Sequence, residues 1–102
     1  MGLKAEAFEI YDMMILSFYK SIEYVSDLKD HVEHYKPLRD ALSHVGALRK
    51  NTFVSLNEKF PNHFEFTKGG VFDRNSKKNN DNLKIEALKL KTIVMDHLCN
   101  GR

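Results

Sequence analysis

The stretch LKAEAFEIYDMMILSFYKSIEYVSDLKDHVEHY, residues 3–35, decides the fold class of this chain. Apolar side chains recur in it every three or four residues from Leu3 to Tyr35, which is the period of one face of an α-helix. Additional apolar residues widen this stripe, so two sides of the helix are expected to pack. The pattern predicts one long N-terminal helix, although a cap at Ser26 and Asp27 would divide it into two.

Pro37 follows this stretch and predicts the start of a second helix. Proline disfavours helical geometry at the residue before it and suits the first turn of a helix. The apolar stripe of this second helix begins at Leu38 and reaches Phe60, with a weak point near residue 51. A last periodic segment predicts a C-terminal helix whose apolar positions are Leu83, Ala87, Leu90, Val94 and Leu98.

Between the second and last helices, residues 63–74 (HFEFTKGGVFDR) alternate apolar and polar side chains around two glycines. Alternation is typical of a β-strand, and the glycines supply a turn. We therefore expect a short β-hairpin near 63–74 with Phe66 opposite Phe72. The whole chain, residues 1–102, is expected to form a single, mainly α-helical domain, a small bundle with this hairpin inserted.

The composition is that of a small globular domain, since 42% of the 102 residues are hydrophobic and 29% are charged. The single cysteine, Cys99, excludes an internal disulfide framework and is typical of a reducing compartment. The first residues lack the pattern of a secretory signal, and no apolar run reaches membrane-spanning length. We expect a cytoplasmic protein with no membrane segment. Because a core this small is marginal, we also expect a homodimer formed through the broad stripe of the first helix.

The charge of the chain is +2 at pH 7, and it is unevenly distributed. Residues 1–60 hold eight Lys and Arg against nine Asp and Glu, whereas residues 61–102 hold eight against five. The excess of positive charge in the C-terminal part indicates a polyanion partner, or else an ordinary solvated basic face.

Metal and cofactor sites are not predicted. Asp27 with His31, and Asp30 with His34, are four residues apart and can share a helix face, but zinc sites usually need three or four converging ligands. The glycine pair at 69–70 is not followed by the Lys-Ser or Lys-Thr of a phosphate-binding loop.

The hexapeptide RDALSH, residues 39–44, combines side chains that suit phosphodiester chemistry. On a helix, Asp40 and His44 lie one turn apart, so the carboxylate can orient the imidazole. Imidazole moves protons near neutral pH, and the Arg39 guanidinium can hold a phosphate with paired N–H donors. These three residues are therefore the candidate catalytic site, and they need no metal.

The same hexapeptide resembles the signature of the HEPN superfamily, in which an arginine is followed by a polar residue, three variable residues and a histidine. The resemblance implies a small helical bundle and a metal-independent endoribonuclease of a toxin–antitoxin or antiviral defence system. It also implies a dimer in which two motifs face each other, with Arg39 and His44 catalytic and Asp40 supporting them. RNA would be the substrate, and an antitoxin would be the expected protein partner.

Two other functions remain open from the residues alone. One is a non-enzymatic helical interaction protein, such as a phage- or plasmid-encoded inhibitor, an immunity protein or an accessory subunit that binds a protein partner. The other is a nucleic-acid-binding accessory subunit that uses the basic C-terminal part. In both cases RDALSH would be an ordinary polar helix face.

Overall fold

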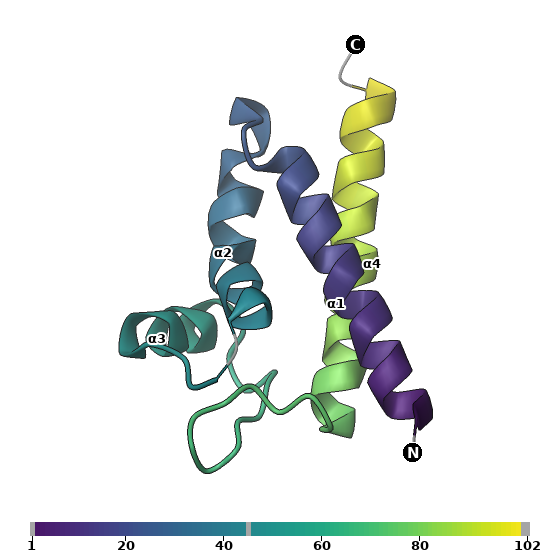
Figure 1. Cartoon of the computed structure of the whole chain (residues 1–102). Helices are drawn as coiled ribbons and strands as arrows, with labels where there is room; N and C mark the ends of the chain where they lie inside the picture. The colour runs from purple at the N-terminus through teal and green to yellow at the C-terminus, as the bar shows by residue number, and fades with distance from the viewer. Residues whose placement is uncertain (1, 45, 101–102) are drawn as a thin grey trace.

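The computed structural model describes residues 2–44 and 46–100 (Figure 1). In this part of the chain four α-helices and one short 3-10 helix follow in the order α1 (Gly2–Ile22), η1 (Ser26–Leu28), α2 (Lys29–Ser43), α3 (Lys50–Lys59) and α4 (Lys77–Asn100). The same described residues form no β-strand. The prediction of a mainly α-helical chain is therefore confirmed.

One hydrophobic core lies between α1, α2 and α4, and α3 and the loop after it cover one end of the core. In Figure 1, α1 and α4 lie side by side and run in the same general direction, from the foot of the view upwards. Removing these apolar side chains from water is the main force that holds the helices together. The buried side chains of the core are Ile15, Tyr19, Ile22, Tyr35, Leu38, Ala41, Leu42, Leu56, Phe60, Phe64, Phe72, Leu83, Ala87, Leu90 and Val94.

The long N-terminal helix predicted from the apolar period is interrupted between residues 22 and 29. The N–H of Val25 donates to the carbonyl of Ile22, and the N–H of Leu28 donates to that of Val25, each at 3.0 Å. These tight turns reverse the chain, so that α2 folds back against α1. The division foreseen at Ser26 and Asp27 does occur there, but no side-chain cap bond accompanies it. The period continues across the break because both helices turn their apolar faces to one core.

Pro37 does not begin a helix as predicted, because it lies inside α2 and is buried. A proline has no N–H, so the carbonyl of Glu33 receives no helical hydrogen bond from this position. Burial of the neighbouring side chains Leu38, Ala41 and Leu42 in the core compensates for that loss. Helix α2 ends at Ser43.

The broad stripe of α1 is covered in part within the chain. Ile15, Tyr19 and Ile22 are at most 3% exposed, and α1 contacts both α2 and α4, whereas Ile10 and Met13 are 57% and 68% exposed. The homodimer stays a prediction.

The expected β-hairpin near residues 63–74 is not supported. Phe66 does lie opposite Phe72, as predicted, but through an isolated antiparallel bridge, and a second isolated bridge joins Ala47 to Val71. The loop turns at Gly70, whose φ of +76° is unfavourable for a residue with a side chain. Val71 thus pairs with the segment before α3, and the two bridges stay isolated.

The loop is tied to α4 by a buried asparagine. The Asn79 side chain accepts a hydrogen bond from the Glu65 N–H at 2.6 Å and donates to the carbonyls of Glu65 and Asp73 at 2.8 and 2.9 Å. Asn79 is fully buried, so these bonds satisfy polar groups that water does not reach. They fix where α4 begins relative to the loop.

Candidate functional site

The hexapeptide RDALSH occupies the last turn of α2 and the residue after it. His44 has extended backbone angles, φ −93° and ψ 133°, and its N–H donates to the Asp40 carbonyl at 3.1 Å. His44 is thus the residue at which α2 ends, not a helical residue as predicted. Among the described residues no hydrogen bond joins the carboxylate of Asp40 to the His44 ring.

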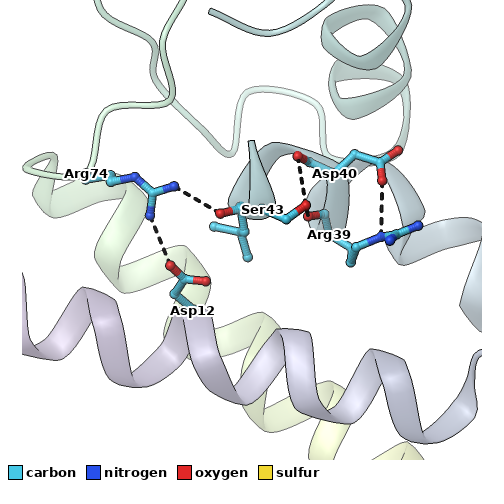
Figure 2. Close-up of polar contacts among 6 residues, drawn as sticks. Asp12, Arg39, Asp40, Ser43 and Arg74 are labelled. Atoms are coloured by element: carbon cyan, nitrogen blue, oxygen red, sulfur yellow. Dashed lines mark hydrogen bonds and ion pairs between the residues drawn. The ribbon is translucent and has the colours of Figure 1, made fainter. Parts of the chain in front are cut away.

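Arg39 faces α1. Its guanidinium carbon lies 4.9 Å from the centre of the Tyr19 ring, a cation–π distance. Its Nε lies 3.1 Å from Oδ1 of Asp40, an ion pair by distance without the alignment of a hydrogen bond (Figure 2). Burial raises the pKa of Tyr19, and the adjacent Arg39 charge opposes that rise. Arg39 is therefore engaged with Tyr19 and Asp40.

A cavity of about 310 Å³ opens beside the end of α2. It lies between the last turn of α2 and the first turn of α3, and polar side chains supply most of its wall. The structure brings Asp40 and His44 to this cavity, whereas Arg39 does not line it. The lining residues are Asp40, Ser43, His44, Leu48, Arg49 and Thr52.

Arg49 is the cation of this cavity, and motif reasoning did not select it. It is the N-cap residue of α3, with φ −66° and ψ 150°, and its side chain makes no capping hydrogen bond. The first N–H groups of a helix have no intrahelical acceptor and carry partial positive charge. The sequence signal that could have found this residue is the basic pair Arg49-Lys50, which follows Gly46. Arg49 and the start of α3 together favour an anion in the cavity.

Arg74 fixes the end of α2 in place. Its Nη1 donates to Oδ2 of Asp12 on α1, and its Nη2 donates to the carbonyl of Leu42, both at 3.0 Å (Figure 2). The carbonyls at the C-terminus of a helix carry partial negative charge, so a guanidinium there is favourable. The hydroxyl of Ser43 donates to the carbonyl of Arg39 at 2.9 Å and closes the same turn.

A second polar group lies in the core between α2 and α4. The Tyr35 hydroxyl donates to Oε1 of Glu86 at 2.9 Å, and Lys89 lies 3.7 Å from the other carboxylate oxygen. Burial, together with the Glu86 charge, raises the pKa of Tyr35 well above its ordinary value of 10.0. Burial also lowers the pKa of His34, whose ring contacts those of Tyr35 and Phe60. This packed cluster joins the helices.

The structure also bears on metal binding and on membrane-spanning helices. No group of three or more His, Cys, Asp and Glu side chains gathers at a metal-binding distance in residues 2–44 and 46–100. Nor do those residues contain a helix with the length and hydropathy needed to span a membrane.

Comparisons with protein-family models, with curated proteins and with solved structures found no match for this chain. The functional argument therefore rests on the residues and on the geometry around His44.

Proposed function

We propose that the chain is a HEPN-like, metal-independent endoribonuclease that acts at the cavity beside His44 and works as a dimer. One observation carries the proposal: His44 and Asp40 line a single open cavity together with Arg49. This places a proton-transferring group, a carboxylate and a phosphate-binding cation around one space. The resemblance of residues 39–44 to the HEPN signature supports the same reading.

The chemistry requires a base and an acid. Cleavage through the RNA 2′-hydroxyl forms a bond from that oxygen to phosphorus and breaks the bond to the 5′-oxygen. The base removes the 2′-hydroxyl proton, and the acid protonates the leaving 5′-oxygen. In the proposal His44 exchanges these protons and Arg49 binds the phosphate, because fixed positive charge stabilises the transition state.

Arg39 and Asp40 take supporting roles in this proposal. The Arg39 charge lies beside Asp40 and holds its carboxylate at the cavity edge. Asp40 and His44 line the same cavity, so the carboxylate lies near the ring that transfers the proton in this proposal. The arginine that the resemblance implies as catalytic is thus a positioning residue, and Arg49 replaces it at the phosphate.

Two copies complete the proposed site. One imidazole does not serve comfortably as base and acid in the same step, whereas two facing His44 rings divide these tasks. The resemblance alone extends the proposal further, to a toxin or antiviral defence system in the cytoplasm with an antitoxin as the protein partner.

The experiment is cleavage of end-labelled RNA by the wild type and by single variants, each checked for folding. We expect Arg49→Ala to lower the rate by about a hundredfold, as loss of a charge-stabilising group does. Arg39→Ala should cost less, because its guanidinium does not line the cavity. His31→Ala is the matched control for His44→Ala, since His31 is an exposed histidine on α2, the helix that ends at His44.

The chemical signature of the products gives a second readout. Cleavage should continue in EDTA and should leave a 2′,3′-cyclic phosphate and a 5′-hydroxyl. A 2′-deoxy nucleotide at the cut site should block it. Equal RNA-cleavage rates for Arg49→Ala and the wild type would show that cleavage does not take place at this cavity.

A non-enzymatic interaction protein is the second candidate function. The observation that favours it is a row of large apolar side chains on the outer face of α4, each 45–48% exposed: Ile85, Leu88 and Met95. Such a surface is typical of a protein-binding site.

A further inference from the structure

Helix α4 presents two opposite faces. Leu83, Ala87, Leu90 and Val94 turn one face to the core. At about 100° per residue, the exposed Ile85, Leu88 and Met95 centre on the other side of the helix. The C-terminal half of α4 lies at the edge of the bundle in Figure 1. The exposed side chains show that the outer face is open to a partner.

The outer face has the spacing of a coiled-coil seam. Its residues alternate three and four apart, which places them at the a and d positions of a heptad. Thr92 stands within this row, and its hydroxyl donates to the Leu88 carbonyl at 3.0 Å. That hydroxyl is therefore satisfied within α4 and does not oppose packing by a partner. We call this row the α4 seam: Ile85, Leu88, Thr92, Met95 and Cys99.

Lysines border the α4 seam. Lys77, Lys84 and Lys91 are spaced seven residues apart along one edge, and Lys89 lies on the other edge. All four are exposed. Lys77 pairs with Asp81 at 3.3 Å, whereas the described residues supply no ion pair to Lys84 or Lys91. Lys89 lies 3.7 Å from Glu86, and Asp96 is an acid on the same edge as Lys89, so the two edges together carry a net positive charge.

A second copy of this chain fits the α4 seam less well than a partner with acidic edges. A parallel pair places Lys84 opposite Lys89 of the second copy, since heptad edges meet five residues apart, and in that pair Lys91 alone meets an acid, Asp96. The antiparallel register that seats Ile85 against Met95 places Lys91 opposite the same lysine of the second copy. Like charges at these edge positions oppose pairing, whereas glutamates there would satisfy the lysines.

We propose that the α4 seam binds an amphipathic helix of a partner protein whose apolar stripe follows the heptad and whose edges are acidic. The partner's apolar residues pack between Ile85, Leu88 and Met95, and its carboxylates face Lys84 and Lys91. This assignment deepens the second candidate function and is independent of the ribonuclease proposal, because the seam shares no residue with the His44 cavity.

The test uses two synthetic helical peptides with isoleucine at heptad position a and leucine at heptad position d. At the edge positions e and g, one peptide has glutamate throughout and the other has lysine throughout. Fluorescence anisotropy measures binding of each labelled peptide to the intact chain. We expect the acidic peptide to bind at least about tenfold more tightly than the basic one, with the difference reduced by added salt.

Variants identify the surface. Lys84→Glu with Lys91→Glu should reverse the preference between the peptides. The exposed lysines of α2 provide the matched control, and Lys29→Glu with Lys36→Glu should leave the preference unchanged.

Several results would overturn the proposal. These are binding of neither peptide, equal binding of both, and a preference that the Lys84 and Lys91 changes do not alter.

A dimer of the chain alone that dissociates on Leu88→Ala with Met95→Ala would assign the seam to a second copy. Binding to anionic vesicles that competes with the acidic peptide would assign it to a lipid surface. Leu88→Ala with Met95→Ala should leave RNA cleavage unchanged, so failure here and failure of the ribonuclease proposal are distinguishable.

Discussion

Removing the Tyr35 hydroxyl should destabilise the fold, because the buried Glu86 carboxylate depends on it. Glu86 is 3% exposed, and the hydroxyl donates to it at 2.9 Å. A hydrogen bond to a charged group contributes about 1.5–3 kcal/mol to stability, and leaving such an acceptor unsatisfied costs a similar amount. Tyr35→Phe keeps the ring and its packing, so we expect a loss of about 2 kcal/mol in the free energy of unfolding.

Urea denaturation followed by circular dichroism measures this loss, and an unchanged slope shows that the unfolding reaction is the same. Tyr24→Phe is the matched control, because Tyr24 is 91% exposed and its hydroxyl is in water. In a Glu86→Gln background the cost of Tyr35→Phe should shrink, since a neutral amide binds the hydroxyl less strongly. The reasoning is refuted if Tyr35→Phe is no more destabilising than Tyr24→Phe.

Three further outcomes follow from the contacts. The contribution of Tyr35 to stability should be constant up to pH 10 and fall above it, because the unfolded chain then loses a proton that the folded Tyr35 retains; this fall, measured by urea denaturation across pH, should be smaller in Tyr35→Phe. Asn79→Ala should cost about 1–3 kcal/mol by leaving the Glu65 N–H without its acceptor, and hydrogen exchange in the loop should rise, whereas unchanged exchange would contradict the role of Asn79. Gly70→Ala should cost about 1 kcal/mol from its positive φ alone, since the nearest atom to an added Cβ is the Ala47 Cβ at 3.9 Å, and calorimetry with no shift would contradict this.

Periodicity predicted the parts of this fold that depend on local patterning. The last helix is the clearest case, because Leu83, Ala87, Leu90 and Val94 all lie in the core. The same period included Leu98, which is 59% exposed. A periodic row shows which residues share a face, but it does not show how far along the helix the neighbouring elements reach.

The breaks in the helices were harder to predict. The apolar period runs unchanged through the turn after Ile22, because both helices face one core. Pro37 is tolerated inside α2 because its neighbours are buried. The local preferences of proline do not include the stabilisation that comes from this burial.

The candidate site was predicted in part. Asp40 and His44 meet at one cavity, but Arg39 turns to the Tyr19 ring on another helix, a contact that sequence spacing does not contain. Arg49 joins the cavity because the chain turns back between α2 and α3, again a tertiary effect. Spacing within a motif describes one helix, whereas a site is made where two helices meet.

Cleavage of RNA by the wild type and by His44→Ala tests the central claim most directly. His44 is exposed and outside the core, so the variant should fold normally. The account predicts a wild type that cuts RNA in EDTA and a variant slower by about a hundredfold or more, as loss of a proton-transferring group requires. A folded wild type that leaves varied RNAs intact, or a His44→Ala variant that cuts them at the wild-type rate, would contradict it.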